Sequence, residues 1–395
     1  MVQGRDGECN PCSEHEKIGA NTLTTIANKD MVQRDHMRRF DVQTGQRTYS
    51  IMIERGILRR VSEFIPGSVG KAFIVTTEDV WRLHGQQVED ALKHEHDVLF
   101  LAGGEVNKRL AAVEELAEQM VSRGADRTSI VIGFGGGIVT DVSGFLAAVF
   151  MRGIQVLQIP TTLMAQVDAA IGGKTGVNLI AGKNLIGSFH QPLAVLVDPE
   201  VISTLSDREY RAGLFEVLKC GVIRDRGLFD LLANLPVAVL GREPEYLDDL
   251  IAGAVQIKAE VVSADEREND LRRILNFGHT IGHAIEAETE YVRFLHGEAV
   301  AWGMIAATRL SEILELLDPG EAQTIRRVIC RYGPLPSPKN LDPDRLLQRL
   351  AADKKTFQGK VHFVLPTRIG QVKIVSGIEP AAVRRAIVES LQESS

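Results

Sequence analysis

This chain of 395 residues has few cysteines, no long apolar run and no surplus of positive charge. Its four cysteines are too few for a disulfide framework at this length, which fits a reducing cytoplasm. No apolar run approaches the ~18 residues that a membrane helix needs, and the N-terminal segment lacks the apolar core of a secretory signal. The formal net charge of -7 argues against a dedicated nucleic-acid binder but leaves room for a local basic pocket. We therefore expect a soluble cytoplasmic protein.

Glycine, by contrast, is abundant, with 36 residues, and the length of the chain predicts two domains. Residues 1–40 are polar and show neither helical nor strand periodicity, so we expect a disordered tail, in which Met31 and Met37 are alternative starts. Cys9 and Cys12 in this tail have the spacing of a metal or redox pair. No second pair or nearby histidine cluster completes a zinc site, so we interpret them as incidental.

The remaining sequence divides into an alternating part and a helical part. Residues 41–204 alternate β-branched runs with helical stretches, which predicts an α/β domain with a mostly parallel, Rossmann-like sheet. Residues 205–395 are dominated by a 3.6-residue periodicity, which predicts a mainly α-helical domain. We expect strands over residues 72–75, 129–133, 155–159 and 194–197, helices over 105–124 and 140–151, and, near the C-terminus, a strand pair over 361–365 and 371–375 followed by a last helix.

A glycine-rich turn from Gly133 to Gly137 leads from a predicted strand into a helix. Glycine lets the backbone approach a ligand closely, and the N-terminus of a helix offers free N–H donors to a phosphate. The spacing is not the dinucleotide-binding fingerprint, because Ile138 stands where its third glycine would be. A tight turn without a ligand is the alternative. Asp141 in the first helical turn suits a sugar hydroxyl, and residues 103–108 begin another helix at the same carboxyl edge of the sheet, where ligands gather.

Residues 152–184 gather cationic and amide side chains among glycines. Lysines in glycine-rich loops are poor core material and poor helix surface, but they suit the anchoring of phosphate and carboxylate groups. A merely solvated loop is the alternative, although Ile171, Val177 and Ile186 indicate that the segment is packed. The polar members of the segment are Arg152, Thr161, Thr162, Gln166, Asp168, Lys174, Thr175, Asn178, Lys183 and Asn184.

The helical part holds several side chains that bind transition metals. His279 and His283 are four residues apart on one predicted helix, and His296 opens the next. Glu216 interrupts an otherwise apolar helix face, and Glu298 follows His296 closely. Spacing alone leaves open which three of these five bind, and core histidines with satisfied hydrogen bonds are the alternative. Two histidines and one carboxylate with an open position would polarise an alcohol or carbonyl oxygen.

Taken together, these motifs resemble the 3-dehydroquinate synthase family, a member of the sugar phosphate cyclases, from about Phe40 to the C-terminus. The resemblance is highly specific because several long motifs occur in order with the family's separations. The segments that carry it are residues 135–137 with Asp141, then 160–163, 166–168, 172–178, 182–184, 216–219, 276–280, 296–299 and 353–355.

The resemblance implies a dehydroquinate synthase-like fold and a role for each matching residue. The metal ligands would be Glu216, His279 and His296, whereas His283 would face the substrate. The implied catalytic residues are Lys174, Lys219, Arg272, Asn276 and His283. The implied substrate-binding residues are Arg152, Asp168, Asn184, Lys258 and Lys355. The implied NAD contacts are Gly103, Gly104, Glu105, Val106, Asn107, Lys108, Gly137, Ile138, Val139, Thr140, Asp141, Thr161, Thr162, Lys174, Lys183, Val201, Ile202, Ser203 and Thr204.

The sequence departs from the family pattern at a few positions. Thr77 and Asp79 lie in the segment where the family usually has an Asp and an Asn for the adenosine ribose. Thr140 replaces a residue that is commonly small. Both departures concern the predicted NAD site and leave the predicted metal ligands untouched.

The implied reaction is that of a lyase in the shikimate pathway of aromatic amino acid biosynthesis. It converts 3-deoxy-D-arabino-heptulosonate 7-phosphate to 3-dehydroquinate and phosphate by transient oxidation with NAD, phosphate elimination, re-reduction and intramolecular aldol closure. A divalent metal, zinc or cobalt, serves as Lewis acid. The resemblance also suggests a homodimer that binds neither nucleic acid nor membrane.

Three other functions compete with this one. A sister cyclase would act on sedoheptulose 7-phosphate or glucose 6-phosphate, but Lys258, Arg272, Asn276 and His283 match the dehydroquinate pattern. A metal-dependent polyol dehydrogenase would release NADH stoichiometrically. A noncatalytic sensor of NAD or a sugar phosphate would have lost a metal ligand or the Lys183–Asn184 pair, and this chain keeps both.

Overall fold

The computed structural model describes residues 37–352 and 361–392. The predicted tail therefore lies outside the described residues apart from its last four, and so do Cys9, Cys12 and Met31. Lys355, a predicted substrate contact, also lies outside them. The first strand already begins at Arg38, so regular structure starts before the predicted boundary at residue 40.

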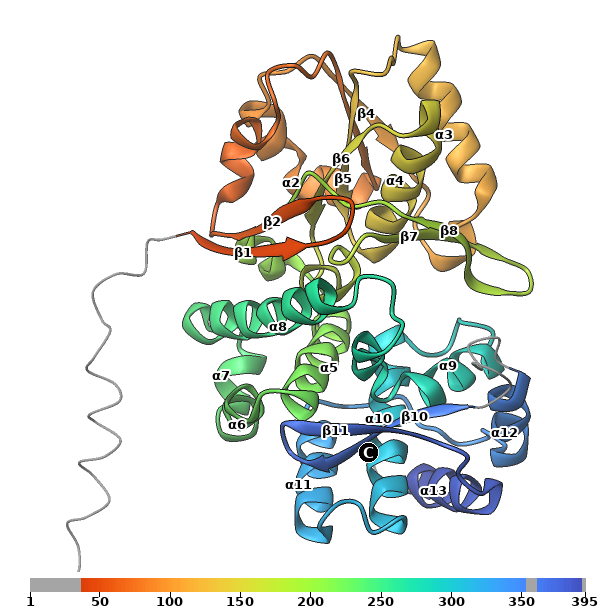
Figure 1. Ribbon diagram of the computed structural model, residues 1–395. Coiled ribbons are helices and arrows are strands. Elements are labelled where there is room, and N and C mark those ends of the chain that lie inside the picture. Colours follow the sequence, from red (N-terminus) through yellow and green to blue (C-terminus); the bar gives the residue numbers. More distant parts are fainter. Residues whose placement is uncertain (1–36, 353–360, 393–395) are drawn as a thin grey trace, which may run out of the picture. The chain divides into compact units, whose positions relative to one another are not determined.

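A seven-stranded sheet organises the N-terminal part (Figure 1). Its order is β1-β2-β9-β6-β5-β3-β4, and all neighbouring pairs are parallel except β1 with β2. The four strands predicted with bounds are present as β3, β5, β6 and β9. β4 is the strand implied by the expected position of residues 103–108 at the carboxyl edge, and β1 and β2 were not anticipated. The strands are β1 (Arg38–Gln43), β2 (Thr48–Ile53), β3 (Ala72–Thr76), β4 (His96–Phe100), β5 (Ile130–Gly135), β6 (Gln155–Pro160) and β9 (Ala194–Val197).

Both faces of this sheet are covered, as expected for parallel strands with helical crossovers. Phe73 and Val131 point to the face packed by α3 and α4, whereas Ile74 and Ile132 belong to the core shared with α2 and η1. The predicted helix over residues 105–124 is split, because a 3-10 turn precedes α3. The covering elements are η1 (Ile57–Phe64), α2 (Glu78–Ala91), η2 (Glu105–Asn107), α3 (Leu110–Ser122), α4 (Gly137–Val149), η3 (Phe150–Arg152), η4 (Ala165–Ala169) and η5 (Pro199–Thr204).

The lysine-bearing segment forms an antiparallel hairpin rather than the glycine-rich loops that the sequence predicted. Strands β7 (Lys174–Leu179) and β8 (Gly182–Phe189) pair from Lys174 opposite Phe189 to Leu179 opposite Gly182. Gly176 and Gly187 make the pairing close, because a Cβ on Gly187 would lie 2.0 Å from the Thr175 carbonyl oxygen. The glycines that suggested loops are therefore requirements of a tight ladder.

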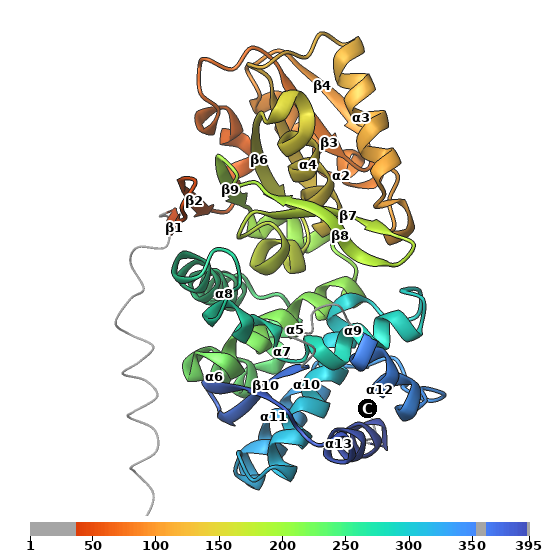
Figure 2. The same cartoon turned by 45° about the vertical axis from the view of Figure 1, so that its right-hand side comes forward.

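Helices build the C-terminal part (Figure 2). The predicted C-terminal strand pair is present as β10 (His362–Arg368) and β11 (Gln371–Ser376), and the predicted last helix is α13 (Pro380–Gln392). The other elements are α5 (Asp207–Ile223), α6 (Arg226–Asn234), α7 (Pro236–Leu240), α8 (Pro244–Ala264), η6 (Leu271–Asn276), α9 (His279–Glu288), α10 (His296–Ile313), α11 (Pro319–Arg331) and α12 (Pro343–Ala352).

One apolar core runs from the sheet into the helices. It contains Ile51 and Ile132 of the sheet together with Leu218 of α5 and Met304 of α10. Residues 38–395 accordingly form one unit by their contacts, so the division at residue 204 remains a prediction. None of the helices within the described part of the chain is long and apolar enough to cross a membrane.

Candidate active site

Three side chains from three helices converge on one point in the helical part. Glu216 lies within α5, and His279 and His296 are the first residues of α9 and α10. The Nε2 atoms of His279 and His296 lie 3.7 Å and 3.9 Å from Glu216 Oε1, and one ligand atom from each residue lies within 4.8 Å of the others. We call Glu216, His279 and His296 the metal triad.

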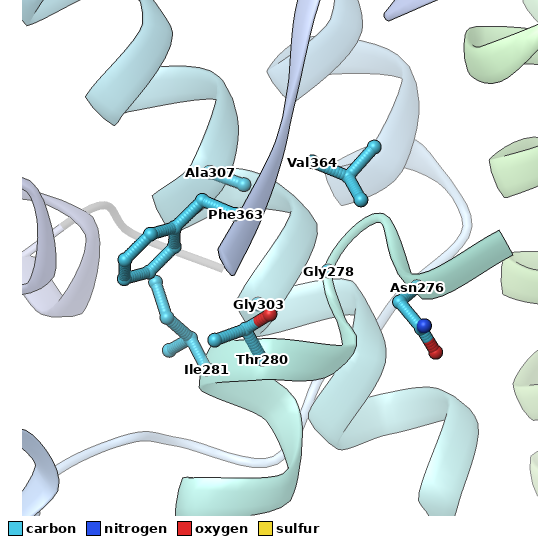
Figure 3. Close-up of a pocket in the computed structure, with 8 residues that line it drawn as sticks. All are labelled: Asn276, Gly278, Thr280, Ile281, Gly303, Ala307, Phe363 and Val364. Carbon is cyan, nitrogen blue, oxygen red and sulfur yellow. The ribbon is translucent and has the colours of Figure 1, made fainter. Parts of the chain in front are cut away.

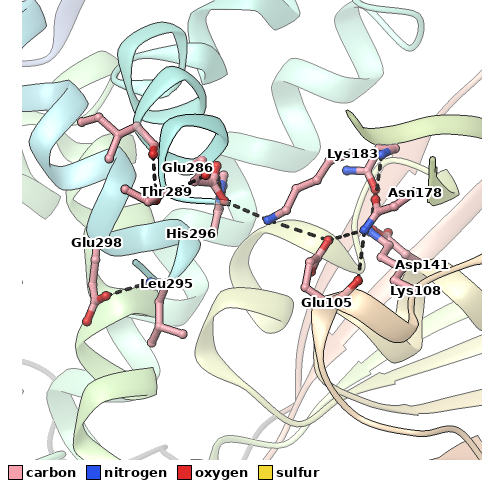
Figure 4. Close-up of polar contacts among 12 residues, drawn as sticks. Glu105, Lys108, Asp141, Asn178, Lys183, Glu286, Thr289, Leu295, His296 and Glu298 are labelled. Atoms are coloured by element: carbon pink, nitrogen blue, oxygen red, sulfur yellow. Dashed lines mark hydrogen bonds and ion pairs between the residues drawn. The ribbon is translucent and has the colours of Figure 1, made fainter. Parts of the chain in front are cut away.

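The two histidines of the metal triad are oriented by bonds to their other ring nitrogen. Nδ1 of His279 lies 3.2 Å from the Phe277 carbonyl oxygen, to which it donates. Nδ1 of His296 lies 3.1 Å from Oε2 of Glu286, which is 1% exposed (Figure 4). Both bonds turn Nε2 toward Glu216, which is how outer partners fix metal-binding histidines.

The triad fits a divalent transition metal. Neither carboxylate oxygen of Glu216 has a hydrogen-bond partner although the residue is only 1% exposed, and Lys219 is its ion-pair partner. A buried carboxylate with unused acceptor capacity is costly, and a cation held between it and two imidazole nitrogens would remove that cost. Burial and the neighbouring Lys219 charge lower the pKa of His279 well below its usual value, which keeps the ring neutral as a ligand must be.

Glycines let α9 and α10 approach closely enough to bring the histidines together. A Cβ on Gly303 would lie 1.9 Å from the Gly278 carbonyl oxygen, and one on Gly282 would lie 3.0 Å from the Ala299 carbonyl oxygen. Gly278 itself has φ +80°, a left-handed conformation that favours glycine. Figure 3 shows this contact, with Asn276 and Phe363 on either side of it.

The remaining metal candidates separate clearly. Glu298 forms an ion pair with Arg208 at 2.7 Å and accepts from the Leu295 backbone N–H at 2.8 Å, so it caps α10. His283 stays close to the triad, with its ring centre 5.4 Å from that of His279 and 5.8 Å from that of His296. Of the five candidates that spacing left open, the geometry brings Glu216, His279 and His296 within ligand distance of one another, and it also groups His283 and His296 with Glu286.

Beside the triad lies a set of cations, Lys174, Lys219, Lys258 and Arg272, which we call the lysine cluster. Lys258 Nζ donates to the Asp168 carbonyl oxygen at 2.7 Å and pairs with its carboxylate, and Lys219 Nζ lies 3.8 Å from that carboxylate. Burial raises the pKa of Asp168, but Lys258 and Lys219 outweigh it and hold the pKa below its usual value. The cluster is held together by acids of the chain itself.

Two further members of the lysine cluster meet the loop before η6. Lys174 forms an ion pair with Glu268, whose other oxygen accepts from Asn276 Nδ2 at 2.5 Å. Arg272 is 2% exposed and donates to the carbonyl oxygens of Gly172 and Glu266. Sequence reasoning did not single out Glu268, because nothing in its local pattern shows that it faces Lys174.

The carboxyl edge of the sheet gathers the predicted NAD contacts (Figure 4). Lys108 Nζ pairs with Asp141 and donates to Asn184 Oδ1 at 2.6 Å. Asn178 Nδ2 donates to Glu105 Oε1 at 2.8 Å, and its own Oδ1 accepts from the Asn184 backbone N–H at 2.9 Å. The β7–β8 hairpin is therefore bonded to the segment that follows β4.

The glycines at the carboxyl edge fall into two groups, one within the turn from Gly133 to Gly137 and one at Gly103 and Gly104. A Cβ on Gly133 would lie 2.2 Å from Ser143 Oγ, and one on Gly135 would lie 2.6 Å from a Val139 methyl group, so these glycines serve internal packing. A Cβ on Gly103 or Gly104 would meet nothing within 4 Å, which leaves space for a ligand beside that backbone. The carboxyl edge thus fits an extended cofactor such as NAD.

Several predicted NAD contacts have their side chains engaged within the protein. Thr140 Oγ1 donates to the Gly137 carbonyl oxygen at 3.0 Å, and Thr204 Oγ1 lies 2.8 Å from His84 Nε2. Ser203 Oγ donates to the Glu200 carbonyl oxygen. Val139, Val201 and Ile202 belong to the buried apolar cores, and Thr161 is buried directly after the carboxyl end of β6.

Among the predicted site residues that the structure describes, Arg152 is separated from the metal triad and the predicted NAD contacts. It is exposed and lies between the end of α4 and the start of β6, at the amino edge of the sheet. The predicted NAD contacts lie at the opposite, carboxyl edge. Its substrate role remains a prediction, as does that of Lys355 beyond the described residues.

Solved structures define the class to which this fold and site belong. A 2-epi-5-epi-valiolone synthase from Streptomyces hygroscopicus subsp. jinggangensis, solved with NAD⁺ and Zn²⁺ bound, matches with TM-score 0.78 at 28% identity, covering 87% of this chain and 96% of that one. A 2-deoxy-scyllo-inosose synthase complexed with carbaglucose-6-phosphate, NAD⁺ and Co²⁺ matches with TM-score 0.78 at 25% identity, covering 89% and 99%. The chain has the fold of the sugar phosphate cyclases.

Sequence comparison identifies the family. Models of the 3-dehydroquinate synthase N-terminal and C-terminal regions match residues 98–212 and 213–356. The 3-dehydroquinate synthases of Solibacter usitatus (strain Ellin6076) and Koribacter versatilis (strain Ellin345) are 60% and 50% identical, each over 89% of this chain and 98% of the relative. The chain belongs to the 3-dehydroquinate synthase family and is an enzyme with that function.

Proposed function

We propose that the metal triad and the lysine cluster form one active site that converts 3-deoxy-D-arabino-heptulosonate 7-phosphate to 3-dehydroquinate and phosphate. The carrying observation is that Lys219, 1% exposed, pairs with Glu216 of the triad and lies 3.8 Å from Asp168 of the cluster. A metal position and an anion position are therefore contiguous in one buried network.

The proposed division of labour follows the geometry. When bound, NAD supplies reversible hydride transfer and the divalent metal, zinc or cobalt, supplies Lewis acidity toward a substrate oxygen. Glu216, His279 and His296 would hold the metal, and the carboxyl edge from Gly103 to Lys108 and from Gly137 to Asp141 would hold NAD. His283, beside both triad histidines, is placed to hold or pass a proton.

The lysine cluster suits a substrate with a carboxylate and a phosphate. Arg272 and Lys258 are almost fully buried, and their charges are shared with backbone carbonyls and with Asp168. Lys174 and Asn276 converge on the Glu268 carboxylate, which supports a position between them for a substrate carboxylate. Substrate anions would take over contacts that acids of the chain occupy here.

The proposal extends to properties that the site geometry does not address. We propose that the enzyme acts in the cytoplasm as a homodimer. Arg152 and Lys355 would complete the substrate contacts.

The test combines metal analysis with a phosphate-release assay on purified protein. We expect about one zinc or cobalt per chain and phosphate release from the heptulosonate phosphate that depends on added NAD. Sedoheptulose 7-phosphate and glucose 6-phosphate serve as matched substrates without the carboxylate. Turnover of sedoheptulose 7-phosphate alone would overturn the proposal in favour of a sister cyclase, and continuous net accumulation of NADH would favour a dehydrogenase.

A further inference from the structure

Glu286 is a buried acid that the proposed mechanism does not use. It lies in the last part of α9 and is 1% exposed. Both of its oxygens are engaged, Oε2 by His296 Nδ1 at 3.1 Å and Oε1 by Lys183 Nζ at 2.9 Å. A buried carboxylate persists only when it is paired in this way, so the three side chains form a fixed unit.

On one side, this unit reaches the metal triad. Because the Glu286 carboxylate accepts from Nδ1, the neutral ring of His296 carries its proton on Nδ1 and its lone pair on Nε2, which lies 3.9 Å from Glu216 Oε1. His296 is the first residue of α10, and at this position its ring could otherwise adopt several orientations. Glu286 therefore selects both the tautomer and the direction of the ring.

On the other side, the unit reaches the carboxyl edge of the sheet. Lys183 comes from β8, lies 4.6 Å above the ring of Tyr291 and is 3.7 Å from Glu105 Oε1. Through Lys183, Glu286 thus connects the β7–β8 hairpin to α9, the helix that carries His279. A chain of charges runs from His296 through Glu286 and Lys183 to Glu105 (Figure 4).

We propose that Glu286 is a positioning residue that holds His296 in its metal-binding tautomer and fixes Lys183 against the helical part. This inference rests on the proposed function, since it takes the triad as the metal site. Outer carboxylates of this kind typically change metal affinity about 10–100-fold when replaced.

A different role for Glu286 makes a distinguishable prediction. His283, Glu286 and His296 also bring one ligand atom each within 4.8 Å of one another. If Glu286 were itself a metal ligand there, the wild-type protein would bind a second metal ion through it. Replacement of Glu286 would then remove that ion and leave the first site at its original affinity.

The experiment measures zinc affinity directly, by competition with a chromophoric chelator on metal-free protein. Glu286→Gln keeps the shape of the side chain and one oxygen that can accept from His296 Nδ1, but it removes the charge that strengthens this bond. Glu288→Gln is the matched control, because Glu288 lies on the same helix and pairs with Arg345 and Arg349 instead. Lys183→Met removes the lysine partner of Glu286. The Lys183→Met/Glu286→Gln double variant avoids leaving a buried lysine without its acid.

We expect Glu286→Gln to weaken zinc binding about 10–100-fold and to shift the visible spectrum of the Co²⁺-loaded protein. Glu288→Gln and Lys183→Met should stay within about threefold, since Glu286 still holds His296 in both. The double variant should also bind zinc more weakly than Glu288→Gln, because a neutral amide oxygen accepts less strongly than a carboxylate from His296 Nδ1, and it carries the test if the single variant does not fold.

Two results would overturn the inference. One is zinc affinity in both Glu286 variants equal to that of Glu288→Gln. The other is loss of a second bound ion with the first site unchanged, which would make Glu286 a ligand. Zinc binding by the wild-type protein separates this test from the proposed function: weak zinc binding in the variants supports the positioning role even if the phosphate-release assay fails.

Discussion

The metal triad and the lysine cluster adjoin each other but are prepared in opposite ways. Oε1 of Glu216 has no hydrogen-bond partner and faces the Nε2 atoms of both triad histidines, while Oε2 forms an ion pair with Lys219. In the lysine cluster, by contrast, Lys174 and Lys258 already have the acids Glu268 and Asp168. The triad can gain a metal ion at Oε1 of Glu216 while Oε2 keeps its ion pair with Lys219, whereas Lys174 and Lys258 must exchange acids of the chain for those of a substrate.

This difference explains how one site can bind both a metal ion and a substrate. A metal ion needs fixed donors at short range, so the triad depends on rigid helix packing and on outer hydrogen bonds. A substrate that enters and leaves needs cations whose charge is satisfied in its absence, because buried cations without partners are costly.

The largest effect is expected for His279→Ala, which removes one donor from the triad. Metal content should fall from about one ion per chain to near zero, and phosphate release should fall at least about 100-fold, because the metal contributes several kcal/mol to catalysis. His96→Ala, at the far edge of the sheet, is the control. Activity retained at wild-type zinc content would refute the metal assignment.

Gly303→Ala should damage the triad without touching any donor. The added Cβ would lie 1.9 Å from the Gly278 carbonyl oxygen, so α10 must move away from α9. Overpacking of this kind costs about 1–3 kcal/mol, and zinc affinity should fall with the stability measured by urea unfolding. Gly67→Ala, where a Cβ would meet nothing within 4 Å, should leave both unchanged. Equal behaviour of the two variants would show that the helix contact does not set the site.

Lys258→Met should affect the lysine cluster alone. Loss of a charged hydrogen bond to the substrate predicts a rise in KM of about tenfold or more, with zinc content unchanged. The control is Lys71→Met, whose lysine pairs with Glu95 and Asp97 away from the site. If zinc content also fell in Lys258→Met, the triad and the cluster would not be separable.

The smallest effect is expected at His190, whose backbone N–H donates to the Gly173 carbonyl oxygen next to Lys174. Burial lowers the pKa of His190 below its usual value of 6.5, although its bond to the Ile154 carbonyl oxygen opposes this. The unfolded chain therefore binds more protons than the folded one just below pH 6.5. The stabilisation is full above pH 6.5 and is lost as the pH falls toward the folded pKa.

Urea unfolding of wild type and His190→Gln between pH 5 and 8 measures this contribution. The free energy of unfolding should fall less steeply with acid in His190→Gln than in wild type. Identical slopes would show that burial does not lower the pKa of His190 in the folded protein.

Sequence patterns predicted the local elements well where a single element carries its own signal. The runs around Ile74, Ile132, Leu157 and Val195 are β-branched or apolar on both faces, and each is a strand. The hairpin was missed because Gly176 and Gly187 look like loop residues until a second strand is known to lie 2–3 Å from any added Cβ. The hairpin pairing, not the local propensity, makes them strand residues.

The chemical types in the site came from the sequence, together with the family resemblance that they carry. The five metal candidates, the lysines between glycines and the glycine turn all depend on residue identity, which the sequence contains in full. Which candidates act together depends on distances between α5, α9 and α10, and these follow from packing contacts such as that of Gly303 with Gly278. Only the tertiary structure could turn Glu298 toward Arg208 and place Glu286 between His296 and Lys183, because partners far apart in the chain meet only once the helices pack.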